Sequence, residues 1–204
     1  MIEKAHLDDK RTVLFYQALL EKHGKSFRAL NWGSAESQRK RFEVLSDVGM
    51  KSGDRILDVG CGLADLYAWI LEQNLRVNYT GIDITPSMTQ AAQNRFPDAI
   101  ITNKTIFDTE LSVDVFDYVV ASGIFFLRKE DPMGHMEKVV SAMFQKCVKG
   151  IAFNSLSAWA LEKKEREFYA DPLKVIEFCK KLSSNIILRH DYHPADFTVY
   201  VFKR

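Results

Sequence analysis

The chain has 204 residues, of which 47% are hydrophobic and 27% are charged, the composition of an ordinary globular protein with one full-sized core. Its 28 Lys and Arg residues against 27 Asp and Glu residues leave a net charge of +1, too little to attract a phosphate backbone. The first ten residues are too charged for a secretion signal, and no stretch has the apolar length of a membrane span. The three cysteines form no paired or zinc-binding spacing, which fits a reducing compartment. We therefore expect a cytoplasmic protein without a nucleic-acid, membrane or metal partner.

The first fifty residues are predicted to be helical. Apolar residues recur at helical spacing between Val13 and Leu20, and a second helical pattern follows Ser34. A turn containing glycine, lysine and aspartate then begins, and the periodicity of the sequence changes. We expect residues 1–50 to form a helical cap on a second unit at residues 51–204.

Strand and helix signals alternate after residue 50. Runs rich in β-branched and aromatic residues predict five strands, at residues 55–59, 77–83, 100–107, 116–122 and 150–154. Helical patterns lie between most of them, at residues 65–73, 86–95 and 132–146. This alternation predicts a parallel sheet that is covered by helices on both faces.

The C-terminus departs from this alternation. Two further strand signals, at residues 186–192 and 197–202, are separated by only four residues. A connection this short joins antiparallel strands. We therefore expect the parallel sheet to end in an antiparallel hairpin.

The residues that indicate chemistry begin with a glycine loop after the first predicted strand. Residues 56–62 read Ile-Leu-Asp-Val-Gly-Cys-Gly. Gly60 and Gly62 permit a sharp turn from strand to helix and let a ligand approach the backbone closely. A G-x-G sequence alone is a weak signal, because a tight strand-to-helix turn that binds nothing is an alternative.

Acidic residues around this loop indicate the charge of its ligand. Asp58 directly precedes the loop, and Asp83 ends the next strand, where a carboxylate can accept hydrogen bonds from ribose hydroxyls. Asp65 replaces the third glycine of the dinucleotide signature G-x-G-x-x-G, and acids at this point would repel a pyrophosphate. One charge pair at ~4 Å is worth about 4 kcal/mol at an effective dielectric constant of ~20. The acids therefore favour S-adenosylmethionine (SAM), whose ammonium and sulfonium are positive, over NAD or a flavin dinucleotide.

Three segments, in this order, resemble successive motifs of the class I SAM-dependent methyltransferases. They are residues 56–62, Gly-Ile-Asp-Ile-Thr-Pro at 81–86 and Phe-Asp-Tyr-Val-Val-Ala-Ser at 116–122. The resemblance implies a three-layer, Rossmann-like, doubly wound α/β fold with seven strands in the order 3-2-1-4-5-7-6 and an antiparallel last strand. It also implies SAM as the cofactor. One departure is Ala64, where many members carry a third glycine.

The resemblance and the placement of polar residues together suggest which residues contact the cofactor. The glycine loop would surround the methionine end of SAM, Asp83 would hold the ribose, and three cap residues would reach the cofactor carboxylate. Trp32 as a core anchor, Arg41 as a solvated charge and Asp108 as a turn residue remain alternatives. The complete predicted set is Trp32, Gln38, Arg41, Asp58, Gly60, Cys61, Gly62, Asp83, Ile84, Met88, Asp108 and Ser122.

The sequence defines no catalytic residue, but it offers candidates. His135 begins a predicted helix, Asn154 ends the fifth predicted strand, and Tyr169 could supply an aromatic face near the methyl group. His193 has acidic neighbours and could act as a general base, or it could simply form the hairpin turn. It would serve catalysis only if that turn lies at the ligand-binding edge of the sheet.

The expected function is transfer of the SAM methyl group to a small-molecule acceptor by in-line displacement. Two alternatives stay open: an RNA or protein methyltransferase of the same fold, and a non-catalytic SAM-binding protein. The sequence defines neither the acceptor nor the oligomeric state.

Overall fold

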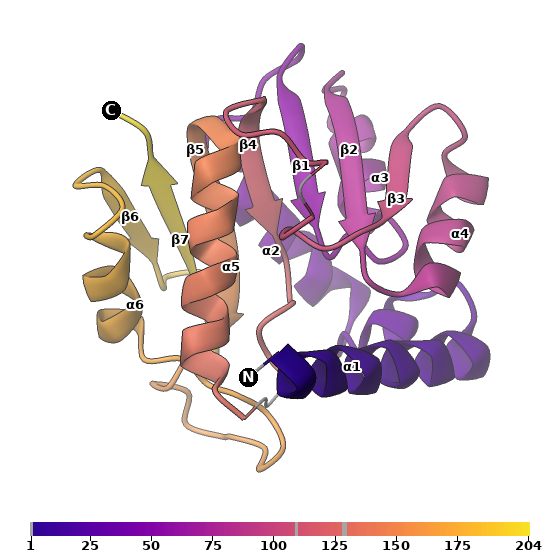
Figure 1. Ribbon diagram of the computed structural model, residues 1–204, viewed down its shortest axis with the longest axis horizontal. Coiled ribbons are helices and arrows are strands. Elements are labelled where there is room, and N and C mark those ends of the chain that lie inside the picture. The colour runs from indigo at the N-terminus through magenta and orange to yellow at the C-terminus, as the bar shows by residue number, and fades with distance from the viewer. Residues whose placement is uncertain (1, 109, 128–129) are drawn as a thin grey trace.

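The computed structural model describes residues 2–108, 110–127 and 130–204 of the chain (Figure 1). The N-terminal part comprises helix α1 (Ile2–His23), a short 3-10 helix η1 (Phe27–Leu30) and helix α2 (Ala35–Ser46). The remaining elements are, in chain order, β1 (Arg55–Val59), α3 (Asp65–Glu72), β2 (Asn78–Asp83), α4 (Pro86–Arg95), β3 (Ile100–Asn103), β4 (Phe116–Ala121), α5 (Pro132–Lys146), β5 (Cys147–Leu156), α6 (Pro172–Cys179), β6 (Ile186–Arg189) and β7 (Asp196–Phe202).

The seven strands form one sheet in the order β3-β2-β1-β4-β5-β7-β6. The pairs from β3 to β5 are parallel, and β7 is antiparallel to both β5 and β6. This confirms the predicted fold class and strand order. The third strand is shorter than predicted because the Asp108 side chain accepts a hydrogen bond from the Thr105 amide at 2.6 Å, which closes a turn after the strand. Helix α6 and η1 were not predicted.

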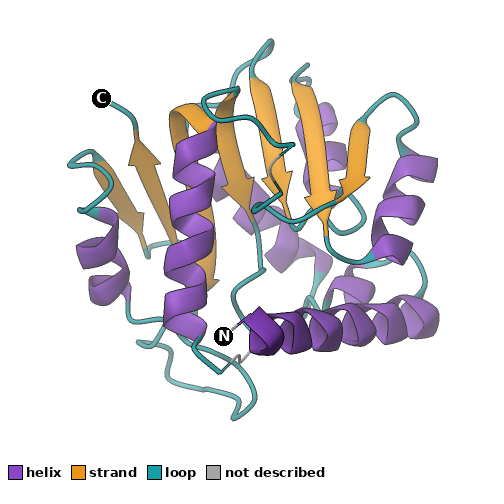
Figure 2. Cartoon of the chain, viewed as in Figure 1, coloured by secondary structure: helices purple, strands orange, loops and turns teal. Residues whose placement is uncertain are grey.

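Helices cover both faces of the sheet and give three layers (Figure 2). Successive residues of a strand point to opposite faces, so Leu57 packs with the α5 side and Ile56 with the side of α2 and α3. Helix α4 packs over β2 and β3, where Tyr79 and Ile101 belong to a third cluster. Each face of the sheet therefore carries an apolar layer, and the polar residues of the sheet gather where the strands end.

Helix α1 lies across the edge of the sheet at which β1, β2 and β4 end (Figure 1). Its residues Tyr16 and Leu20 pack on a small cluster that includes Met88 of α4. Helix α2, in contrast, contributes Phe42 and Leu45 to the apolar layer under the sheet. A division of the chain at residue 50 stays a prediction.

The hairpin turn between β6 and β7 lies at the edge of the sheet that α1 crosses. Asp196, the first residue of β7, pairs with Leu156, the last residue of β5. Because β5 is parallel to β1 and β4, the turn that precedes Asp196 is at the carboxyl ends of the parallel strands. His193 therefore lies at the ligand-binding edge of the sheet, as a role in catalysis would require.

None of the described helices has the length and apolar character needed to cross a membrane.

Candidate cofactor and acceptor site

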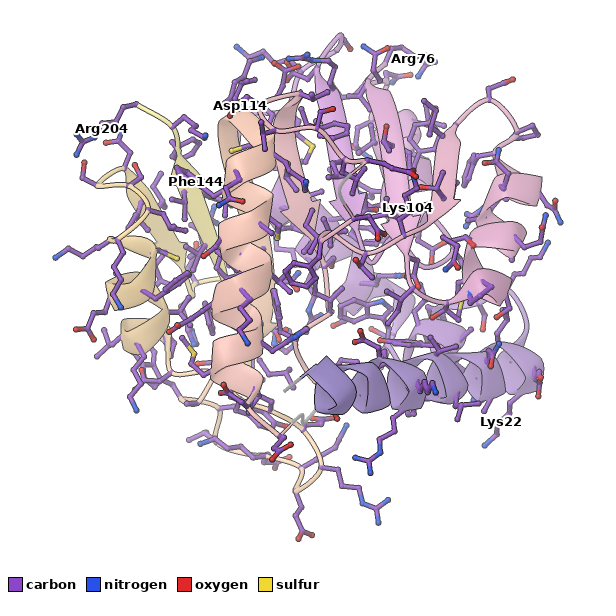
Figure 3. The ribbon with its side chains drawn as sticks, viewed as in Figure 1. Lys22, Arg76, Lys104, Asp114, Phe144 and Arg204 are labelled. Atoms are coloured by element: carbon purple, nitrogen blue, oxygen red, sulfur yellow. The ribbon has the colours of Figure 1, made fainter. Side chains whose placement is uncertain are left out.

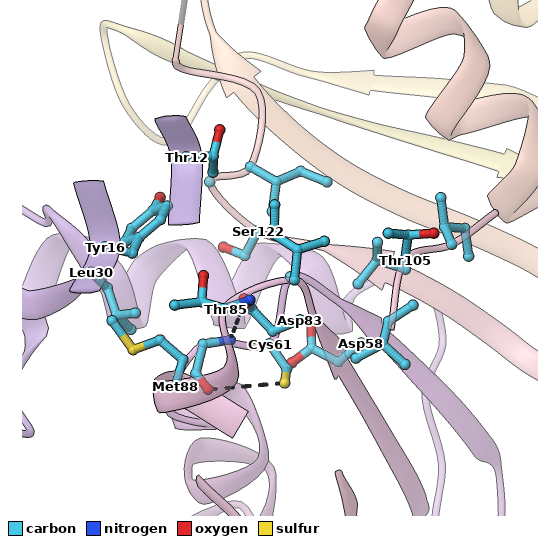
Figure 4. Close-up of a pocket in the computed structure, with 18 of the residues that line it drawn as sticks. Thr12, Tyr16, Leu30, Asp58, Cys61, Asp83, Thr85, Met88, Thr105 and Ser122 are labelled. Atoms are coloured by element: carbon cyan, nitrogen blue, oxygen red, sulfur yellow. Dashed lines mark hydrogen bonds between the residues drawn. The ribbon is translucent and has the colours of Figure 1, made fainter. Parts of the chain in front are cut away.

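A cavity lies at the carboxyl edge of the sheet, between the ends of β1, β2 and β4 and helix α1 (Figure 4). On α1, Thr12 and Tyr16 face Thr85 and Ser122 across it (Figure 4). The structure brings together most of the residues that the sequence predicted. Those that line this first cavity are Trp32, Gln38, Asp58, Gly60, Cys61, Gly62, Asp83, Ile84, Met88, Ser122 and His135.

The glycine loop forms the floor of the first cavity. The amides of Gly60 and Cys61 both donate to the Ile82 carbonyl, at 2.8 and 3.0 Å, which fixes the loop to β2. Gly60 and Gly62 have φ angles of 73° and 53°, in the left-handed region that favours glycine. A Cβ atom on Gly60 would lie 2.3 Å from the Ile124 side chain. The glycines are therefore required both by backbone conformation and by close packing.

Asp83 connects the glycine loop to the start of α4. One of its carboxylate oxygens accepts a hydrogen bond from the Gly62 amide at 3.0 Å, and the other accepts one from the Thr85 amide at 2.8 Å. Each oxygen keeps a second lone pair for a ligand. Burial raises the pKa of Asp83, although these amide bonds oppose the shift. Thr85 is fully buried beside this carboxylate.

Asp58 lies beneath the loop and accepts a hydrogen bond from the Tyr79 hydroxyl at 2.7 Å. Burial raises the pKa of Asp58 to about 7; the Tyr79 bond lowers it, and the charges of Asp83 and Asp65 raise it further. Crowded carboxylates of this kind are stabilised by a positive ligand.

The charged residues that line the first cavity show whether a positively charged cofactor such as SAM fits it. Four acids line it, Asp9, Asp58, Asp65 and Asp83. Among the described lining residues the only lysine or arginine is Lys104, labelled in Figure 3, and it pairs with Glu110. The excess of acids suits a positively charged nucleoside and disfavours a pyrophosphate.

Some lining residues were missed by sequence reasoning. Asp9, Thr12 and Tyr16 reach the cavity because α1 crosses the sheet edge, and a helical pattern alone does not reveal such a crossing. Burial, with a smaller effect of the Asp83 charge, raises the pKa of Tyr16. Residues 104–107 also line the cavity, whereas Asp108, which was predicted to contact the cofactor, is not among its lining residues.

Gln38 connects the cap to the first turn of α3. Its side-chain amide donates to the Asp65 carboxylate at 3.1 Å. Arg95 of α4 donates to the other oxygen of Asp65 at 2.5 Å. Asp65 therefore joins three helices beneath the glycine loop.

A second cavity adjoins the first and shares Leu30, Trp32 and Gly123 with it. Three of the residues singled out in the sequence, Arg41, Asn154 and His193, lie here rather than in the first cavity. The complete lining is Leu30, Asn31, Trp32, Gly33, Ser37, Arg41, Gly123, Phe125, Phe126, Asn154, Ser155, Leu156, Lys164, Glu167, His193 and Asp196.

Arg41 is buried in this second cavity. Its guanidinium forms an ion pair with Asp196 and donates to the Ser37 carbonyl at 2.8 Å. It also lies 4.8 Å from the centre of the Trp32 ring. Burial lowers the pKa of Arg41 to about 10, so the side chain remains charged at neutral pH. Arg41 is therefore not a solvated charge, and its predicted contact with the cofactor carboxylate stays a prediction.

Asn154 and Tyr169 hold loops around the second cavity. Asn154 accepts from the Gly123 amide at 2.7 Å and donates to the Ser122 hydroxyl at 3.1 Å, which fixes the segment after β4. The Tyr169 hydroxyl donates to Glu167 at 2.7 Å, and Tyr169 lines neither cavity. Tyr169 therefore acts on the site only through other residues, whereas Asn154 both lines the second cavity and positions the segment after β4.

The boundary between the cavities depends on Gly123, whose φ angle is 72°. A Cβ atom on Gly123 would lie 2.7 Å from the Trp32 ring. We expect Gly123→Ala to lower the free energy of unfolding by about 2 kcal/mol, because it combines left-handed strain with overpacking. Urea denaturation measures this change. Gly33→Ala is the matched control, since a Cβ on Gly33 would meet no atom within 4 Å; equal stabilities of the two variants would contradict the prediction.

Comparison with known proteins identifies the family. A family model described as a methyltransferase domain matches residues 57–147. A protein of Mycobacterium tuberculosis (strain ATCC 25618 / H37Rv) named "Putative methyltransferase Rv1506c" is 33% identical over 158 residues, which cover 72% of this chain and 92% of that protein.

Solved structures show the same fold. A SAM-dependent methyltransferase from Archaeoglobus fulgidus aligns with a TM-score of 0.66 at 14% identity, covering 84% of this chain and 95% of that one. Magnesium protoporphyrin IX methyltransferase (ChlM) from Synechocystis PCC 6803, solved with bound SAM, aligns with a TM-score of 0.60 at 13% identity, covering 83% of this chain and 79% of that one.

The fold and the site define a Rossmann-like nucleoside-binding protein. The chain belongs to the class I SAM-dependent methyltransferases; it is an enzyme, and SAM is its cofactor.

Proposed function

We propose that this methyltransferase transfers the methyl group of SAM to a small molecule that binds in the second cavity. The observation that carries the proposal is the shared wall of the two cavities at Leu30, Trp32 and Gly123. Residues of α1 line the first cavity, and Lys164 and Glu167 of the segment before α6 line the second. In that segment the Phe168 amide donates to the Phe126 carbonyl at 2.8 Å. Because these segments enclose the two cavities, a small acceptor fits there better than a folded RNA or protein. A neighbour of this fold, the magnesium protoporphyrin IX methyltransferase, is likewise named for a small-molecule acceptor.

The residues of the first cavity would hold the cofactor. Asp83 would accept hydrogen bonds from the ribose hydroxyls, and Asp58 would stabilise the ammonium group together with its neighbouring acids. Ile84 and the buried side chain of Met88 would flank the adenine. Gln38 would act through Asp65, to which it donates a hydrogen bond, rather than by touching the cofactor.

When bound, SAM supplies a methyl group that is already activated by its positive sulfur. The remaining task of the protein is to align the acceptor and to exclude water. Ser122 and Gly123, held by Asn154, would shape the passage between the cavities. His135, which lines the first cavity, stays a candidate for removing a proton from the acceptor.

The proposal is tested with SAM that carries a radiolabelled methyl group. The enzyme is incubated with an extract of the source organism that has been divided by ultrafiltration into low-mass and macromolecular fractions. We expect label to be transferred to the low-mass fraction. Transfer to the RNA or protein fraction alone would contradict a small-molecule acceptor, and binding of SAM with no transfer to either fraction would favour a non-catalytic role.

A further inference from the structure

The second cavity also carries information about the class of acceptor, and this inference depends on the function proposed above. Among its described lining residues, the charged side chains are already paired with one another. Arg41 forms an ion pair with Asp196, and both side chains are less than a tenth exposed. Lys164 lies 3.2 Å from Glu167. The described lining therefore has two positive and two negative side chains, each with an opposite charge beside it.

This pairing disfavours a charged acceptor. A charged molecule that enters a cavity loses hydration, and the loss is offset only by an opposite charge or by strong hydrogen bonds. In the described lining, the Arg41 charge is held by Asp196 in a buried pair, and the charge of Lys164, a mostly exposed side chain, lies beside Glu167. An uncharged acceptor loses less hydration and does not disturb either pair.

The apolar part of the cavity suits a flat molecule. Trp32, Phe125 and Phe126 contribute aromatic rings to its wall. The guanidinium of Arg41 lies over the Trp32 ring, and Phe15 of α1 approaches Phe126 with ring centres 6.3 Å apart. Aromatic walls bury planar ligands efficiently by stacking and by edge contacts.

His193 also lines this cavity, and the position of its ring proton decides which hydrogen bond it can offer there. The Ala195 amide donates to Nδ1 of His193 at 3.1 Å, so Nδ1 carries a lone pair and the proton of the neutral ring is on Nε2. Oδ2 of Asp196 is also 3.2 Å from Nδ1, but this oxygen is already paired with the guanidinium of Arg41. Burial and the Arg41 charge lower the pKa of His193, which favours the neutral ring.

We propose that the acceptor is an uncharged, planar molecule that accepts a hydrogen bond from Nε2–H of His193. In this arrangement His193 is a positioning residue and not the general base, because the nitrogen that carries its lone pair, Nδ1, already accepts a hydrogen bond from the Ala195 amide. The acceptor would place an oxygen or nitrogen lone pair against His193 and its planar body against Trp32 and Phe126.

The tautomer of His193 can be measured without any acceptor. The nitrogen chemical shifts of ¹⁵N-histidine-labelled enzyme, with the His193 signals assigned by their loss in His193→Gln, distinguish the two neutral forms. We expect a proton on Nε2 and none on Nδ1 at neutral pH. A proton on Nδ1, or on both nitrogens, would overturn the proposal.

The charge preference is tested with three small probes of similar shape: benzamide, benzoate and benzylammonium. Ligand-observed NMR measures their binding to enzyme saturated with S-adenosylhomocysteine, with dissociation constants expected in the millimolar range. We expect benzamide to bind about fivefold more tightly than either charged probe. We also expect His193→Leu to weaken benzamide about fivefold and His193→Gln, which keeps a donor, to preserve its binding.

The outcomes separate this inference from the proposed function. If the enzyme fails to bind S-adenosylhomocysteine, the proposed cofactor site is wrong. If it binds S-adenosylhomocysteine but prefers benzoate or benzylammonium, or binds none of the probes, only the acceptor class is overturned. Equal benzamide binding by the Leu and Gln variants would remove His193 from its role.

Discussion

Replacing Asp83 with alanine is expected to lower the affinity for SAM by about 100-fold, which corresponds to ~2.7 kcal/mol. The carboxylate holds the amides of Gly62 and Thr85 in place, and its remaining lone pairs face the cavity. The variant would lose the proposed bonds to the ribose as well as the anchor of the glycine loop, and hydrogen bonds to a charged group contribute about 1.5–3 kcal/mol. Isothermal titration calorimetry with SAM measures the change.

Two controls separate binding from folding in this experiment. Asp98→Ala removes an exposed aspartate and should leave the affinity unchanged. Thermal unfolding of the ligand-free variants shows whether Asp83→Ala remains folded. An affinity for SAM equal to that of the wild type in a folded Asp83→Ala variant would show that Asp83 does not bind the cofactor.

The affinity for SAM is also expected to rise with pH up to about pH 7. Burial raises the pKa of Asp58 to about 7, so the carboxyl is mostly protonated and uncharged at lower pH. A positive ligand favours the ionised form, and the affinity should therefore rise up to tenfold per pH unit well below pH 7. Titrations between about pH 5.5 and 7 avoid the range near 7.7–8.0 in which α-amino groups lose their own charge.

Asp58→Asn provides the matched control because asparagine can still accept the hydrogen bond from Tyr79 but does not ionise. We expect this variant to bind SAM more weakly and with a much flatter dependence on pH. A wild-type affinity that is constant from about pH 5.5 to 7 would show that Asp58 does not respond to the charge of the ligand.

The same group should affect the stability of the ligand-free enzyme with a definite sign. The pKa of Asp58 is higher in the folded protein than its ordinary value of 3.8, so the folded state binds the proton more tightly than the unfolded state. Stability from this group therefore decreases as the pH rises from about 4 to 7. Bound SAM should reduce this decrease because it stabilises the ionised carboxylate.

Much of the fold and of the first cavity follows from the sequence because the signals are local. Alternating strand and helix patterns define a parallel sheet, and the short link between the last two predicted strands permits only an antiparallel hairpin. Asp58, Gly60 and Gly62 are close in the chain, and Asp83 ends the next strand. Because parallel strands end at the same edge, these residues had to lie together, and the charges of the acids indicated a positive ligand.

Only the tertiary structure decided what adjoins this cavity. Arg41 pairs with Asp196 at the other end of the chain, and no local pattern predicts a contact over that separation. His193 became a site residue because β7 runs antiparallel to β5 and therefore begins at the carboxyl edge. Tyr16 lines the first cavity because α1 crosses the edge of the sheet. The periodicity of a sequence determines which face of an element is apolar, but the partners of its polar side chains depend on how distant elements pack.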